Sequence, residues 1–255
     1  MAANARRRFV QFPHPGAEHS PDRNGAKAWN PTSKNHARKF LLLRGQWSNG
    51  TDNRTGRLWA WGEWEPESEL VKHLEAATPD HPRYLWNPYF VRRPDYSGLH
   101  NTDPFIFNGF IYSNCKQKAA GSLRGLRELD RGSVLLFGSR VGANWVMDTL
   151  LVISDFVDYD RSNHQRALRG VIPEAFWDVV LGPTYANREN DAFRLYRGAT
   201  VDTPVDGMYS FFPCIPEGRD TGFPRPTVHL PAEYFSRGLL QGAKGHGAGP
   251  TDVRP

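Results

Sequence analysis

Short runs of apolar and aromatic residues, separated by polar and Gly- or Pro-containing segments, recur along most of this chain and indicate β-strands. The clearest pair is KFLLLRGQW (39–47) and RLWAWGEWEP (57–66), joined by the polar turn segment SNGTDNRTG, which together predict a hairpin. Further strands are expected at 105–114, 133–139, 145–159, 193–198, 207–214 and 225–230.

Helical spacing is confined to a few short segments. Residues 67–77 place Leu70, Val71 and Leu74 on one side, residues 116–129 repeat leucine every three positions, and 173–180 suit a third short helix. Because strands outnumber helices, we predict a β-rich α+β fold with a partly closed barrel, short helices and long irregular loops.

The domain organisation follows from the distribution of turn residues. The 20 Pro and 24 Gly residues are spread along the chain, and no internal repeat is visible. Residues 13–37 lack periodicity and predict a long irregular segment. We therefore expect a single domain over 1–240 and a disordered, Gly-rich tail over 241–255.

Composition narrows the class of protein. The 255 residues have a net charge of +5, which permits contact with nucleic acid. The two cysteines lie in dissimilar motifs and form no metal-binding CxxC pair. No run reaches the ~18 apolar residues of a membrane span, and the basic start has no apolar signal region. A cytoplasmic protein that does not contact membranes is the expectation.

Polar residues interrupt apolar strand runs between 101 and 148, where a core does not need them. They are Asp103, Cys115, Lys116, Gln117, Ser139 and Asp148. Cys115 lies at a predicted strand-to-helix junction, which suits a phosphate site or a reactive thiolate. The alternative is a buried cysteine with Asn114 as helix cap. No histidine has a sequence relationship to Cys115 that indicates a dyad.

The motif WAWGEWEP predicts a second part of the same site. In a strand, Trp59, Trp61, Glu63 and Glu65 share one face. The tryptophans would stack on a base, while the two carboxylates and Asp103 would bind base edges or supply acid/base function. The alternative is an ion pair between the carboxylates and an arginine such as Arg44.

Two arginines and one serine complete the predicted ligand contacts. Arg197 and Arg225 would hold phosphate groups together with Lys116. Ser139 follows Gly138 at a strand end, where the backbone can approach a ligand closely. A β-bulge or tight turn at Gly138 is the alternative.

The segment HPGAEH near the start suggests a divalent metal. His14, Glu18 and His19, with His36 further on, carry the ligand types of catalytic zinc sites. Pro15 and Gly16 argue against a helix here, so the metal would be bound by a loop. The alternative is a turn in which His14 packs.

The stretch Asn114-Cys115-Lys116-Gln117, a helix, Arg131 to Ser139 and Asp148-Thr149 resembles bacterial domains linked to nucleotide modification, with PUA-like or ASCH-like barrels. The resemblance covers about a fifth of the chain and implies recognition of RNA or of a modified base. The sequence therefore predicts a nucleotide- or nucleic-acid-binding protein that modifies or reads a base. The alternatives are a metal-dependent enzyme and a non-catalytic protein that binds a protein partner.

Overall fold

The computed structural model describes residues 7–14, 16–21, 26–27, 37–90, 102–113, 115, 117, 124–182, 192–229 and 250–252. Strands dominate these ranges, and the helical segments are short. They are the 3-10 turn η2 (Arg124–Arg127), α1 (His164–Leu168), α2 (Glu174–Phe176) and the π turn η3 (Trp177–Leu181). The predicted β-rich α+β character is confirmed.

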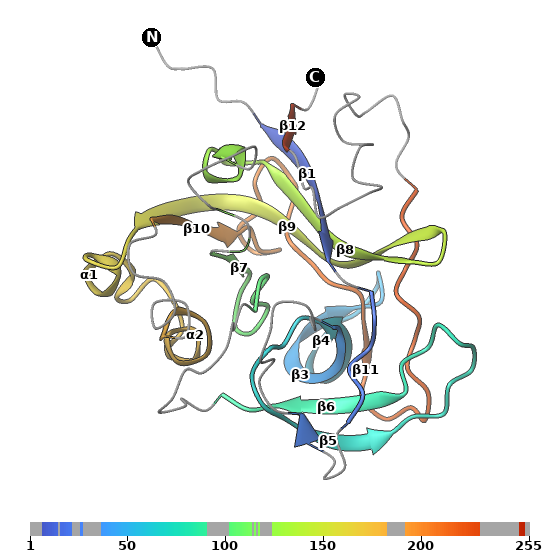
Figure 1. Cartoon of the computed structure of the whole chain (residues 1–255). Coiled ribbons are helices and arrows are strands. Elements are labelled where there is room, and N and C mark those ends of the chain that lie inside the picture. Colours follow the sequence, from blue (N-terminus) through green and yellow to red (C-terminus); the bar gives the residue numbers. More distant parts are fainter. Residues whose placement is uncertain are drawn as a thin grey trace.

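The strands form two mixed six-stranded sheets, which lie above and below each other in Figure 1. Sheet one has the order β12 (Pro250–Asp252), β1 (Arg8–His14), β8 (Val134–Val141), β9 (Asn144–Tyr159), β10 (Phe193–Gly198) and β7 (Ile111–Tyr112). Sheet two has the order β11 (Cys214–Pro216), β4 (Asn53–Gly62), β3 (Lys39–Ser48), β6 (Tyr84–Pro88), β5 (Ser68–His73) and β2 (Ala26–Lys27).

The described strands do not close into one barrel. β1 and β8 are parallel, as are β3 and β6, while the other neighbours are antiparallel. One apolar core cluster joins the two sheets, because it contains Leu41 and Leu58 of sheet two together with Tyr159 and Leu195 of sheet one. The PUA-like barrel therefore stays a prediction.

The predicted hairpin is confirmed, but its second strand is shifted. β3 pairs with β4 from Lys39 opposite Gly62 to Ser48 opposite Asn53. β4 therefore begins four residues before the predicted start and ends at Gly62 instead of Pro66. Glu63 and Glu65 lie beyond the strand, so the alternation of a strand does not set their directions.

The helix predicted over 67–77 is wrong. Ser68–His73 forms β5, which pairs with β6 and β2. Its side chains are largely exposed, Val71 to 45%. Pairing with two neighbouring strands outweighs a weak helical pattern, since propensity is readily overridden by tertiary contacts.

Two other predicted elements are only partly present. Within 105–114, β7 covers two residues, and Phe105 bridges back to Ile111 across a loop in which Asn108 adopts a left-handed φ of 57°. Of the helix over 116–129, η2 is described, while 118–123 lies outside the described residues. The short helix predicted at 173–180 is confirmed by α2 and η3.

The C-terminal segments contain less regular strand than expected. In place of the strand predicted at 207–214, the structure has isolated bridges at Met208 and Phe211, and β11 begins at Cys214. Within 225–230 it has an isolated bridge at Thr227. Within the tail 241–255, Pro250–Asp252 forms β12 against β1. The rest of that tail lies outside the described residues.

In both sheets, polar residues lie where the apolar face of a strand ends. Val10, Phe12 and His14 share a face of β1, as do Leu135, Phe137 and Ser139 of β8, and the parallel register sets His14 beside Ser139. In sheet two, Arg38 precedes β3 and Glu63 follows β4. Between Phe137 and Gly138 the register of β9 shifts, which makes Asp148 a bulge residue.

Gly138 is required by close packing at this bulge. A Cβ atom there would collide with the carbonyl oxygen of Val146 and with the Trp145 ring. We expect Gly138→Ala to lower the free energy of unfolding by about 1–3 kcal/mol, the cost of overpacking. Gly56→Ala is the control, because no atom lies within 4 Å of its Cβ position. Urea denaturation of both variants checks this; equal losses would contradict it.

Candidate functional site

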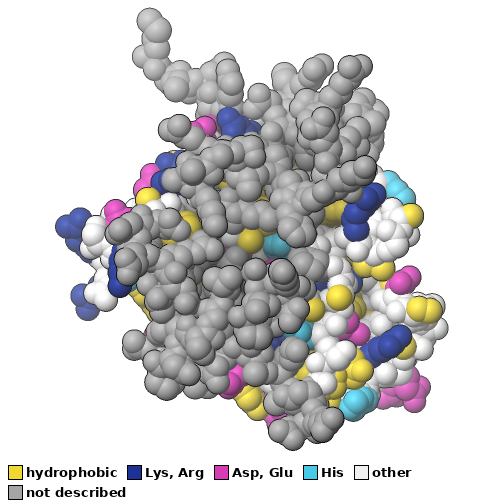
Figure 2. Space-filling model, in the orientation of Figure 1, with side chains coloured by type: hydrophobic (Ala, Val, Ile, Leu, Met, Phe, Trp, Pro, Cys, Tyr) yellow, Lys and Arg dark blue, Asp and Glu magenta, His cyan; other side chains and the backbone are white. Residues whose placement is uncertain are grey.

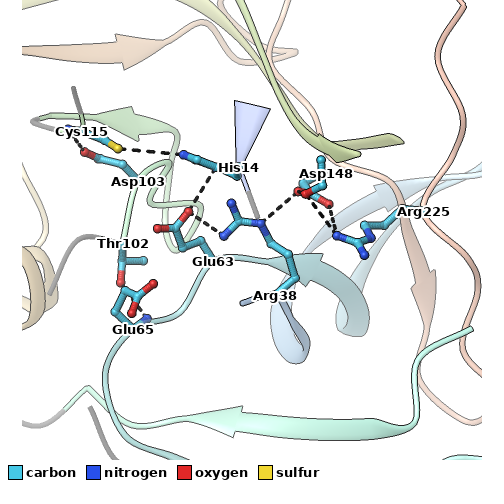
Figure 3. Close-up of polar contacts among 10 residues, drawn as sticks. His14, Arg38, Glu63, Glu65, Thr102, Asp103, Cys115, Asp148 and Arg225 are labelled. Carbon is cyan, nitrogen blue, oxygen red and sulfur yellow. Dashed lines mark hydrogen bonds and ion pairs between the residues drawn. The ribbon is translucent and has the colours of Figure 1, made fainter. Parts of the chain in front are cut away.

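His14 is held between aromatic rings and a carboxylate. Its ring lies 4.9 Å from that of Phe12 and 5.7 Å from that of Phe137, centroid to centroid. Its Nδ1 lies 3.2 Å from Oε2 of Glu63, in surroundings where both side chains are nearly inaccessible to solvent. When Nδ1 donates its proton to Glu63, Nε2 is left as an acceptor. That atom lies 4.0 Å from the sulfur of Cys115 (Figure 3).

Cys115 is fixed by a buried carboxylate. Asp103 accepts hydrogen bonds from the backbone N–H of Cys115 at 2.8 Å and of Ser113 at 3.0 Å, and from the Ser113 hydroxyl at 3.2 Å. The Tyr112 hydroxyl donates to the carbonyl oxygen of Cys115 at 2.7 Å. Burial, followed by the nearby Cys115 and Asp103, raises the pKa of Tyr112 well above its usual value, so this donor stays protonated.

Arg38 joins the two sheets through ion pairs. Its Nη1 donates to Oε2 of Glu63 at 2.6 Å, and its Nε donates to Oδ2 of Asp148 at 3.1 Å. Burial by itself would lower the pKa of Arg38, but Glu63 and Asp148 together raise it above its usual value. The guanidinium therefore stays charged and holds both carboxylates.

The backbone of Arg38 is also anchored. Its N–H donates to the carbonyl of Ala17 at 2.7 Å, and its carbonyl accepts from the N–H of His19 at 2.9 Å. The segment after His14 thus runs beside the start of β3. Gly16 is needed there because a Cβ would meet the carbonyl oxygen of Arg140.

Arg225 covers the other side of Asp148. Its neighbours hold it there: the carbonyl of Phe223 accepts from Trp61 Nε1, and that of Pro226 accepts from the Met147 N–H, both at 2.9 Å. Arg225 donates to Ser139 Oγ at 3.2 Å and lies over the Trp61 ring at 4.6 Å. Burial lowers its pKa, and Asp148 at 3.8 Å only partly offsets this.

The structure gathers most of the predicted residues that carry polar chemistry. His14, Glu63, Asp103, Cys115, Ser139 and Arg225 lie in one connected set of contacts (Figure 3). Glu65 is next to it: its N–H bonds to the Thr102 hydroxyl at 3.2 Å, and its charge acts on Arg38. A thiol, an imidazole and a carboxylate in line are the arrangement of nucleophile, base and orienting group.

Other predicted ligand contacts have different surroundings. Trp59 and Trp61 are each 3% exposed and pack with Phe40, which favours a core role over stacking on a base. The Gln117 amide bonds to the backbone of Arg194 through both its oxygen and its nitrogen. Arg197 forms a two-bond ion pair with Asp155 on the surface. Lys116 lies outside the described residues.

The predicted metal ligands do not converge. His14 faces Glu63, whereas Glu18 accepts from the backbone N–H groups of Arg83 and Tyr84 at 2.9 and 3.1 Å. Among the described residues, no group of three or more His, Cys, Asp or Glu side chains is placed to hold a metal ion, and His36 is not one of those residues. The structure therefore gives the metal hypothesis no support.

Arg38 was not among the predicted site residues. Asp148 was predicted only as a polar residue within an apolar run, without a role. Arg38 directly precedes a strongly apolar strand, and a charge at such a boundary is usually solvated. The sequence marks this position only by the adjacent pair Arg38-Lys39. The structure shows that both side chains are fully buried. The position of Asp148 depends on a bulge, which the sequence does not reveal.

Comparison of the chain with protein-family models, with curated proteins and with solved structures gives no match in any of the three. Within the described residues, no helix has the length and apolar character needed to cross a bilayer.

Arg38 is expected to be essential for stability. Arg38→Met would leave the buried Glu63 and Asp148 without their shared cation, which costs about 3–5 kcal/mol. Arg54→Met is the matched control, since its pair with Asp52 is exposed and contributes about 1 kcal/mol or less. Thermal and urea unfolding measure both. Equal destabilisation by the two changes would contradict this account of the cluster.

Glu18 gives a pH-dependent prediction. Burial raises its pKa above 4.5, despite the opposing bonds from Arg83 and Tyr84. The stabilisation that Glu18 contributes is therefore complete below pH 4.5 and is lost as the pH rises through its folded-state pKa. Gln keeps the acceptor oxygen and does not titrate. Relative to the unchanged chain, Glu18→Gln should become more stable as the pH rises.

Urea unfolding at a series of pH values tests this, with the exposed Glu75→Gln as the control for loss of one charge. A relative stability of Glu18→Gln that falls with rising pH would show that the sign is wrong.

Proposed function

We propose that this protein is a cysteine-dependent transferase or hydrolase that acts on a nucleotide or on a base of DNA or RNA. The observation behind it is the line from Cys115 through His14 to Glu63, with separations of 4.0 and 3.2 Å. Separations of this kind in an unliganded site often shorten when substrate binds. The PUA-like resemblance supplies the substrate class.

Each group has a defined task in the proposed reaction. His14 Nε2 takes the proton of the Cys115 thiol, and the sulfur forms a bond to an electrophilic carbon of the substrate. The leaving group departs with the electron pair of the broken bond and with the proton from His14. Water or a second acceptor with an O–H or N–H group then displaces the sulfur as thiolate and gives its proton to His14, which returns it to Cys115. The protein is a hydrolase in the first case and a transferase in the second.

The other members of the cluster are positioning residues. Glu63 holds His14 in the tautomer with a proton on Nδ1 and stabilises the imidazolium that forms. Arg38 holds Glu63, and Asp103 holds the backbone of Cys115. These three side chains are at most 5% exposed, so their geometry is set by packing.

The described side chains on the face drawn in Figure 2 suit a compact substrate better than a long duplex. On the described part of the face in Figure 2, Lys and Arg side chains lie singly among acidic ones. A protein that tracks a nucleic-acid backbone needs a continuous basic groove. A nucleotide, or a single base presented by a flexible strand, requires only a local site.

The proposal predicts an activated Cys115. In Cys214→Ser the only thiol is Cys115, and in Cys115→Ser it is Cys214, whose pKa is raised by burial. At about pH 6.5 an ordinary thiol is roughly 1% ionised, so we expect iodoacetamide to alkylate Cys115 roughly tenfold faster than Cys214. Mass spectrometry over time measures both rates.

His14→Asn provides the specific control, because its amide can still donate to Glu63 while the acceptor facing Cys115 is removed. It should abolish the rate advantage of Cys115 without unfolding the protein. If Cys115 and Cys214 react alike across the pH range, or if His14→Asn changes nothing, Cys115 is not the nucleophile and the proposed function fails.

A further inference from the structure

One buried donor and one buried acceptor in the cluster have no hydrogen-bond partner in the described part of the chain. The donor is Nη2 of Arg38, on a side chain that is 1% exposed. The acceptor is Oδ1 of Asp148, on a side chain that is 4% exposed. Buried polar atoms are nearly always paired, because an unmet hydrogen bond is costly.

The two atoms belong to the same ion pair. Nε of Arg38 lies 3.1 Å from Oδ2 of Asp148, so the neighbouring Nη2 and Oδ1 extend from groups that face each other (Figure 3). Their other atoms are committed: Nη1 of Arg38 to Glu63, and Oδ2 of Asp148 also to the hydroxyl of Ser139 at 3.3 Å. A ligand that satisfies both remaining atoms must carry an acceptor next to a donor.

The surrounding charge disfavours an anion as that ligand. The side chains labelled in Figure 3 include four carboxyl groups, of Glu63, Glu65, Asp103 and Asp148, and two guanidinium groups, of Arg38 and Arg225. Nη1 of Arg225 lies 3.8 Å from Oδ1 of Asp148, too far for a hydrogen bond. A phosphate would have to approach a carboxylate oxygen that needs a donor, whereas a neutral ring edge supplies one.

We propose that Arg38 and Asp148 are the recognition pair for a nucleobase edge. This rests on the proposed function and names the part of the substrate that the site reads. Nη2 of Arg38 donates to a ring nitrogen or carbonyl oxygen, and Oδ1 of Asp148 accepts from the adjacent N–H, as side chains read base edges elsewhere. Arg38 and His14 share Oε2 of Glu63, so the recognition pair and the thiol belong to one connected cluster.

The test is calorimetric titration of the full chain with adenosine, guanosine, cytidine and uridine, and with inorganic phosphate. At least one nucleoside should bind and slow alkylation of Cys115, while phosphate should do neither. In Asp148→Asn, Arg38 still donates to the amide oxygen, so the NH2 group takes the place of Oδ1 and faces the ligand. Affinity for that nucleoside should then fall roughly tenfold or more.

Asp155→Asn is the matched control, since it removes a carboxylate that pairs with Arg197 on the surface, and it should leave affinity unchanged. If Asp148→Asn does not fold, the unchanged protein is titrated with the same nucleoside methylated on the amide or amino nitrogen that donates. Loss of that donor should give a similar loss of affinity.

The inference is overturned if no nucleoside binds, if phosphate binds instead, or if the bound nucleoside tolerates both Asp148→Asn and methylation. Its failure is separable from that of the proposed function. Nucleoside binding that depends on Asp148, with an unreactive Cys115, would leave the recognition pair intact and remove the catalytic thiol. A reactive Cys115 without nucleoside binding would leave the catalytic thiol intact and remove the recognition pair.

Discussion

The buried guanidinium of Arg38 is the interaction on which the rest of the site depends. It joins the end of the β3–β4 hairpin, through Glu63, to the bulge of β9, through Asp148, and thus connects two sheets that share no strand. Removing three charges from water costs several kcal/mol per ion, which the short contact at 2.6 Å and the remaining hydrogen bonds must offset. Apolar side chains in place of all three charged groups would fill the space at lower cost, so stability alone does not explain the charges here.

The same contact sets the geometry of the chemistry. Because Arg38 and His14 both bond to Oε2 of Glu63, the imidazole is held in a fixed orientation by a group that belongs to the other sheet. Cys115 comes from a third element, the loop after β7, and is fixed by Asp103. A small change in how the sheets pack would therefore alter the distance from thiol to imidazole, while each sheet stayed intact.

The sequence could predict what depends on local pattern. The hairpin of β3 and β4, strands β8 to β10 and the helix at α2 follow from apolar runs and turn residues, and polar interruptions marked Asp103 and Cys115. The pairing of Cys115 with His14 could not be predicted, because it arises from the parallel register of β1 with β8 and from contacts over 101 positions. The same holds for Arg38, whose two partners are 25 and 110 positions away. The prediction for β5 failed because its weak helical pattern is outweighed by pairing on both edges.

Charge balance bears on how the proposed thiol site tolerates several carboxylates. In the proposed reaction, moving the proton from Cys115 to His14 creates an anion near Asp103 and a cation beside Glu63. The first is disfavoured by like charge and the second is favoured, so the two effects oppose each other within one transfer. Asp103 is fully buried and already accepts three donors from the backbone and hydroxyl of its own loop, which disperses its charge away from the sulfur. Glu63, by contrast, lies against the imidazole itself and shares the contacting oxygen with Arg38.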